Sequence, residues 1–186
     1  MSLLEADLKK IIRDYAFLLL VSGSIIALDQ WTKSLVRATL AFEQRWAPWD
    51  WLLPYARIVH WKNTGVAFGM FQHLGDVFLV LSALVSLGII YFFPRVPRNE
   101  PYLRVALALQ LGGAVGNLID RVARGYVTDF ISVGTFAVFN IADSCITIGV
   151  VVLLVGMWLR ERQEKAKVRT ALTDAAQDLA SKQSED

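Results

Sequence analysis

The sequence predicts an all-α integral membrane protein with four transmembrane helices and a small extracytoplasmic β-rich element. Of its 186 residues, 55% are hydrophobic and 19% are charged, which is too apolar for an ordinary soluble domain. The apolar residues gather in four long stretches. The segment between the first two stretches carries turn residues and an alternating pattern typical of a strand.

The four apolar stretches are the candidate membrane helices. They run from Tyr15 to Leu28, Val77 to Phe93, Val105 to Ile119 and Phe130 to Leu159, and the last contains one charged residue, Asp143. At about 1.5 Å per residue, the first three are short for a hydrocarbon core of about 30 Å. They become long enough once flanking polar residues are included, so those polar side chains are expected at membrane depth.

The rest of the chain divides into an outer loop and a tail. Residues 29–76 contain Pro48, Pro54 and the turn-like Asn63-Thr64-Gly65, and the alternation from Arg57 to Trp61 predicts a strand. After Leu159 the sequence is charged. We therefore expect one membrane domain over residues 1–159 and a cytoplasmic tail, partly helical or disordered, over residues 160–186.

The placement of lysine and arginine predicts the membrane topology. Twelve of these residues precede the first stretch, join the second to the third or follow the fourth, whereas seven lie on the other side over a longer length of loop. Short cytoplasmic segments are enriched in Lys and Arg. Both termini are therefore expected in the cytoplasm.

Three acids fall at one predicted depth. Asp29 and Asp120 each lie 16 residues from an arginine at the inner boundary, and Asp143 lies 17 residues from one. At about 1.5 Å per residue, this spacing places each carboxylate about 24 Å from the inner boundary of the membrane, near the outer surface. Because acids near hydrocarbon are costly, this common level predicts a single functional site.

Several classes of function are disfavoured by composition. A net charge of +2 is too small and dispersed for nucleic-acid binding. The lone Cys145 excludes an internal disulfide and a cysteine-built zinc site, and His60 and His73 lie outside the apolar stretches. We expect no metal and no cofactor.

Carboxylates and amides at the ends of the apolar segments predict the chemistry. These residues are Asn117, Asp120, Asp129, Asn140 and Asp143. Two carboxylates held close share one proton, which provides a base to activate water and an acid to polarise a carbonyl group. With amide or arginine donors for a tetrahedral intermediate, the pattern favours a membrane-embedded aspartic peptidase.

Five motifs, in order, resemble the lipoprotein signal peptidase family, also called signal peptidase II, over about Tyr15 to Leu159. They are Leu28-Asp29-Gln30-Trp31-Thr32-Lys33, Asn63-Thr64-Gly65-Val66-Ala67-Phe68, Gly116-Asn117-Leu118-Ile119-Asp120-Arg121, Val127-Thr128-Asp129-Phe130 and Phe139-Asn140-Ile141-Ala142-Asp143. The resemblance implies four transmembrane helices, an outer β-cradle and cleavage of diacylglyceryl-modified prolipoproteins just before the lipidated cysteine.

The resemblance also implies the site. Its catalytic dyad falls on Asp129 and Asp143. The positions around the active site are Asp29, Lys33, Asn63, Gly65, Asn117, Asp120, Arg121 and Asn140. The expected partners are prolipoprotein substrates and membrane lipid, with the enzyme a monomer in the bacterial cytoplasmic membrane and its active site near the outer surface.

Simpler structural roles remain open for the acids. Asp143 could be a helix-packing acid paired with Arg121 or Arg124, and Asp129 could be a loop acid or an N-cap before the fourth stretch. Asp120 and Arg121 could form an interfacial ion pair.

Other residues also have simpler alternatives. Asp29 could mark the end of the first helix and organise Lys33 at i+4. Asn63 and Gly65 could form only a turn. Gly112 and Gly116 form a small-xxx-small pair that predicts close helix packing.

Two other functions fit part of this sequence pattern. A proton- or ion-coupled transporter also keeps acids within helices, but the sequence lacks an internal repeat and paired broken helices. A non-enzymatic assembly factor could use the Trp-rich outer loop. Conservative Asn substitutions at Asp129 and Asp143 separate these from a peptidase, since only a peptidase would lose turnover.

Overall fold

A computed structural model describes residues 3–65 and 75–183 of the chain. Its elements are α1 (Leu3–Thr39), β1 (Arg45–Trp46), the 3-10 helix η1 (Asp50–Leu52), β2 (Ala56–Asn63), α2 (Gly75–Phe92), the 3-10 helix η3 (Phe93–Arg95), α3 (Pro101–Arg124), β3 (Val127–Val133) and α4 (Ile141–Gln183). All four α-helices are long and apolar enough to cross a membrane. The predicted fold class is confirmed.

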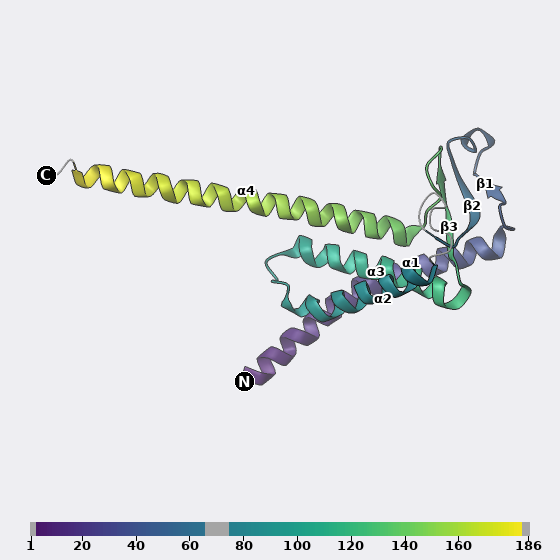
Figure 1. The fold of residues 1–186 in the computed structure, drawn as a ribbon, viewed down its shortest axis with the longest axis horizontal. Helices are drawn as coiled ribbons and strands as arrows, with labels where there is room; N and C mark the ends of the chain where they lie inside the picture. The colour runs from purple at the N-terminus through teal and green to yellow at the C-terminus, as the bar shows by residue number, and fades with distance from the viewer. Residues whose placement is uncertain (1–2, 66–74, 184–186) are drawn as a thin grey trace.

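The sheet stands at one end of the helices. Its strand order is β1-β2-β3 with antiparallel pairing, and Trp61 of β2 lies opposite Asp129 of β3. Figure 1 shows the strands running across the helix direction, with both chain termini toward the opposite end. We call these the sheet end and the connection end, since η3 joins α2 to α3 at the latter.

Helix α3 is the centre of the bundle. Half of the residues in its most apolar 18-residue segment are buried, against 17% in the corresponding segment of each other helix. Glycines allow this close packing: a Cβ on Gly112 would lie 2.8 Å from Ile25 of α1, and one on Gly113 would collide with the Ala142 carbonyl of α4. The predicted packing role of Gly112 is confirmed.

The outward faces of the helices are apolar. Leu20 is 72% exposed and Leu84 is 62% exposed, while a buried cluster around Leu18, Phe93 and Leu111 fills the space between helices. Helices with exposed apolar surfaces of this extent require lipid around them.

Two element boundaries differ from expectation. The fourth apolar stretch does not form one helix, because Phe130 begins the second half of β3 and α4 starts only at Ile141. The segment from Val127 to Val133, in which four of seven residues are β-branched, pairs with β2, and counting apolar residues along the chain does not detect this pairing. Helix α1 continues to Thr39, beyond the expected start of the outer loop at Asp29.

Candidate active site

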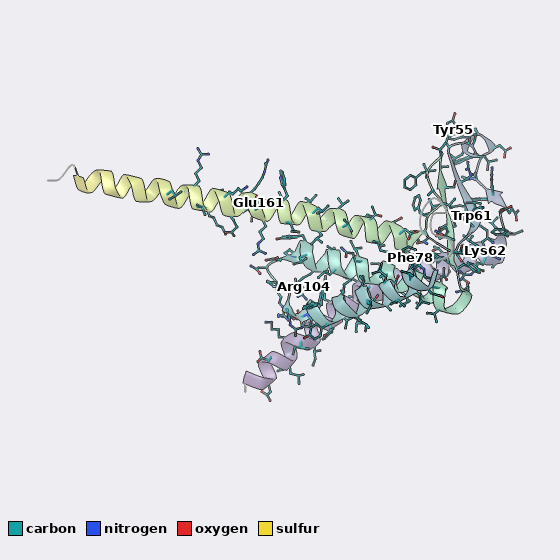
Figure 2. The ribbon with its side chains drawn as sticks, viewed as in Figure 1. Tyr55, Trp61, Lys62, Phe78, Arg104 and Glu161 are labelled. Atoms are coloured by element: carbon teal, nitrogen blue, oxygen red, sulfur yellow. The ribbon has the colours of Figure 1, made fainter. Side chains whose placement is uncertain are left out.

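A cavity of about 470 Å³ lies at the sheet end of the bundle. Both predicted catalytic acids line it, Asp129 from β3 and Asp143 from α4. The helix α2 contributes Phe78, which Figure 2 labels close to the sheet. Apolar residues of α4, including Ile146 and Ile148, form the rest of the wall together with the segment that joins β3 to α4.

Asp129 is held by two amides. Its Oδ1 accepts a hydrogen bond from Asn140 Nδ2 at 2.7 Å, and its Oδ2 accepts one from Asn63 Nδ2 at 2.9 Å. The residue is 1% exposed. Burial, with the nearby charge of Asp143, raises the pKa of Asp129 to about 7 despite these two hydrogen bonds.

Asp143 lies in the first turn of α4. Its Oδ2 accepts a hydrogen bond from the Asn140 backbone N–H at 3.2 Å, while its own backbone N–H donates to Asn140 Oδ1 at 3.0 Å. This reciprocal pair is a capping box, with Asn140 as N-cap. The other carboxylate oxygen, Oδ1, accepts from Asn117 Nδ2 at 2.8 Å.

Asn140 therefore connects the two acids. Its Nδ2 donates to Asp129 and also, at 3.1 Å, to Asn117 Oδ1. Both hydrogens of this amide are in use, as are its oxygen and its backbone N–H. The residue is fully buried, so the geometry between β3 and α4 depends on it.

Lys33 lies behind the cavity. Its ammonium is fully buried and contacts Asp29 Oδ2 at 2.8 Å, Asn117 Oδ1 at 2.9 Å and Asp120 Oδ2 at 3.4 Å. The predicted i,i+4 pairing of Asp29 with Lys33 is confirmed. Through Asn117, this cation is one side chain removed from Asp143.

Asp29 links α1 to the start of α4. Its Oδ1 accepts a hydrogen bond from the Ala142 backbone N–H at 3.0 Å, in the first turn of α4. An acid is favourable there because the helix N-terminus carries partial positive charge. A Cβ on Gly116 would lie 2.7 Å from Asp29 Oδ2, so the glycine leaves room for this contact.

Asp120 joins α3 to β3. Its Oδ2 accepts from the Thr128 backbone N–H at 3.0 Å, and its Oδ1 pairs with Arg124 at 3.0 Å and Arg37 at 3.6 Å. The alternative pairing of Asp120 with Arg121 is wrong. Successive helical residues point in different directions, whereas residues four apart share a face.

Arg121 lines the cavity and interacts electrostatically with both acids, without a direct ion pair to either. Its guanidinium lies 6.0 Å from the Phe78 ring centroid, and among the described residues it forms no hydrogen bond or ion pair. The expected alternative of an Asp143 ion pair with Arg121 or Arg124 is also absent from this described part.

Asn63 and Gly65 do form a turn. The Gly65 backbone N–H donates to Asn63 Oδ1 at 2.9 Å, which leaves Asn63 Nδ2 directed at Asp129. The turn and the site contact are thus the same arrangement. The remaining residues of this motif, 66–68, lie outside the described residues.

The structure therefore brings the predicted residues together in two layers. Asp129, Asp143, Asn63, Gly65, Asn117 and Arg121 line the cavity, whereas Asp29, Lys33, Asp120 and Asn140 lie behind it or between its acids. Sequence reasoning missed Arg37, whose Nη1 donates to Thr128 Oγ1 at 2.9 Å. Its i+4 spacing from Lys33 is the signal that places both on one face of α1.

Comparisons with known proteins agree with this arrangement. The family model for signal peptidase (SPase) II matches residues 21–159. A lipoprotein signal peptidase of Mesorhizobium japonicum is 36% identical over 169 residues, covering 88% of this chain and 96% of the relative. One of Geobacillus thermodenitrificans is 41% identical over 150 residues, covering 78% and 92%.

A solved structure shares the fold. It is described as a bacterial membrane enzyme, and it superposes with a TM-score of 0.70 at 29% identity, covering 76% of this chain and 87% of the other.

Proposed function

We propose that this chain, which belongs to the signal peptidase II family, removes signal peptides from diacylglyceryl-modified prolipoproteins by an aspartic mechanism. In this proposal, Asp129 and Asp143 activate the water that cleaves the peptide bond before the lipidated cysteine. The family supplies the peptidase activity and the bacterial membrane location.

One observation carries the mechanism: two carboxylates from different elements, Asp129 buried and Asp143 half-buried, line one cavity and are both hydrogen-bonded to Asn140. Carboxylates held this way share a proton, so one is a base and the other an acid. The raised pKa of Asp129, about 7, keeps that proton available near neutral pH. Because the two carboxyl groups interact, their apparent pKa values describe the pair and not one residue.

The reaction proceeds by addition of water. The ionised carboxylate takes a proton from water as its oxygen bonds to the scissile carbonyl carbon, while the protonated carboxyl gives its proton to the carbonyl oxygen. Collapse of this tetrahedral intermediate breaks the C–N bond. The protonated carboxyl gives its proton to the leaving nitrogen, and a hydroxyl of the intermediate gives its proton to the other, ionised carboxylate as the carbonyl reforms, which restores the shared-proton state.

We assign Arg121 to stabilising the partial negative charge that develops on the carbonyl oxygen as water adds, before proton transfer to that oxygen is complete. Asn140 has no amide hydrogen left, and Asn117 already donates to Asp143. Arg121 lines the cavity with its donors uncommitted among the described residues. Donors aimed at an oxyanion in a water-poor site are the largest catalytic contribution in many hydrolases.

Lipid recognition follows from the cavity wall. Phe78, Ile146 and Ile148 belong to membrane helices, so acyl chains of a substrate can remain in lipid beside the cavity. Burying acyl chains contributes about 0.8 kcal/mol per methylene, which localises the substrate without a deep protein pocket. With both termini in the cytoplasm, the cavity faces the outer leaflet. One chain supplies all the residues proposed for the site, which is consistent with a monomer.

The test compares a diacylglyceryl-modified precursor with its unlipidated form in the same bilayer, using Asp143→Asn protein as the blank. We expect the unlipidated precursor to be cleaved far more slowly. Equal rates would refute lipid-dependent recognition while leaving the aspartic mechanism standing.

A further inference from the structure

A second cavity, of about 560 Å³, lies at the connection end of the bundle. We call it the inner groove. Lys10, Ile11 and Tyr15 of α1 line one side, and Tyr91, Pro94 and Arg95 of α2 and η3 line the other. Figure 2 labels Arg104 at this end of the molecule, away from Phe78 and the sheet.

The floor of the groove is an acid that is already neutralised. Asp14 is 1% exposed, and its Oδ1 accepts from Arg104 Nη2 at 2.7 Å and from Arg98 Nε at 2.9 Å. Arg98 Nη2 also donates a hydrogen bond to the Lys10 carbonyl at 2.8 Å, which links the segment between η3 and α3 to α1. Two guanidinium groups on one carboxylate leave a positive surplus.

Two more cations lie at the mouth of the groove. Arg95 is positioned by a 2.5 Å hydrogen bond from its Nη1 to the Tyr91 carbonyl and lies 4.2 Å from the Tyr91 ring centroid. In the described part of the chain, neither Lys10 nor Arg95 forms an ion pair. Asp7 is the remaining acid in the lining. With Arg98 and Arg104, which contact Asp14 without lining the groove, four cations and two acids leave two positive charges at this end.

The surface beside the mouth is apolar. Ile11, Ile12, Tyr91 and Phe92 are 44%, 59%, 59% and 58% exposed, and all lie on helices that cross the membrane. A soluble anion would leave this apolar surface uncovered. A lipid contacts both parts, because its phosphate binds the cations while its acyl chains cover the apolar side chains.

We propose that the inner groove binds an anionic phospholipid. Its phosphate lies between Lys10 and Arg95, and its acyl chains run along α1 and α2. Because these cations come from the start of α1 and from η3, the lipid joins two segments at the connection end. This site is separate from the peptidase cavity and does not depend on its mechanism.

Native mass spectrometry of the full chain, released from micelles containing phosphatidylglycerol or phosphatidylcholine, tests the proposal. Two positive charges near a lipid phosphate favour the anionic lipid by about tenfold or more. Lys10→Gln/Arg95→Gln should remove that preference. The matched control, Lys165→Gln/Lys167→Gln, loses the same charge from the exposed part of α4 and should retain it.

Two further arms use the unaltered protein and do not depend on the folding of a variant. High salt should weaken phosphatidylglycerol binding, since the cations at the mouth are exposed. Glycerol 3-phosphate should compete poorly, because it lacks acyl chains. Equal retention of the two lipids, an equal loss in the control variant or effective competition by glycerol 3-phosphate would each overturn the proposal.

Discussion

Asn140 and Asp143 cap each other at the start of α4, with the Asn140 N–H donating to the Asp143 carboxylate and the Asp143 N–H donating to Asn140 Oδ1. The same Asn140 donates its amide to Asp129. One residue thus fixes a helix N-terminus and the relation between two acids. These two roles can be separated by substitution.

Asn140→Ala should lower the free energy of unfolding by about 1–2 kcal/mol through loss of the cap, and turnover should fall at least about tenfold. Asn140→Ser retains an oxygen that caps the helix but lacks the amide that reaches Asp129. We expect Ser to restore stability without restoring turnover. Thermal unfolding and a cleavage assay measure the two effects, and full turnover in the Ser variant would contradict the positioning role.

Lys33→Met should destabilise the protein by about 3–5 kcal/mol, because it leaves Asp29 and Asp120 buried without their shared cation. The control is Lys62→Met, at an exposed position on β2 where Lys lies over two aromatic rings. It should cost less than about 1 kcal/mol. Similar losses of thermal stability in both variants would argue against a buried ion network.

Arg121→Gln should lower kcat by about 10²–10³ with little change in KM, since its donors are assigned to charge that develops during the reaction. Arg124→Gln is the matched control, because Arg124 pairs with Asp120 outside the cavity. Its kcat should remain close to that of the wild type. A loss confined to KM in Arg121→Gln would point to ground-state substrate binding instead.

The shared proton predicts a pH dependence. The folded pKa of Asp129, about 7, lies above its ordinary value of 3.8, so folding favours the protonated form. The corresponding stability is present below pH 3.8 and is lost as pH rises through about 7. Turnover should also fall above about pH 7, as the pair loses its proton.

Asn63→Ala tests whether Asp129 causes this fall in turnover at high pH, the alkaline limb of the pH–rate profile. The Asn63 hydrogen bond lowers the pKa of Asp129, so its removal should move the alkaline limb of kcat to higher pH. An unchanged or lowered limb in a pH–rate profile would be inconsistent with Asp129 as a member of the titrating pair.

Sequence spacing was sufficient to predict that Asp29, Asp120 and Asp143 belong together, because rise per residue is constant along a helix. The structure joins them through Lys33 and Asn117. The apolar stretches and their polar flanks predicted the four membrane helices, although the fourth stretch also contained the second half of β3. These features depend on local regularities that a single sequence contains.

The position of Asp129 could not be obtained in this way. It lies on β3, whose partner β2 is far away in sequence, and strand pairing between distant segments leaves no periodic signal in either. The contact of Asp29 with the Ala142 N–H likewise joins two residues separated by 113 positions. Motif resemblance located these residues, but only the packed structure explains their contacts.

The most direct test of the central claim is cleavage of a diacylglyceryl-modified precursor by purified Asp129→Asn and Asp143→Asn proteins. Asn is nearly isosteric with Asp but cannot serve as the base or hold the shared proton, so we predict that each variant folds and inserts normally yet shows no cleavage above background. Near-normal turnover by either folded variant would contradict the assignment of Asp129 and Asp143 as the catalytic pair.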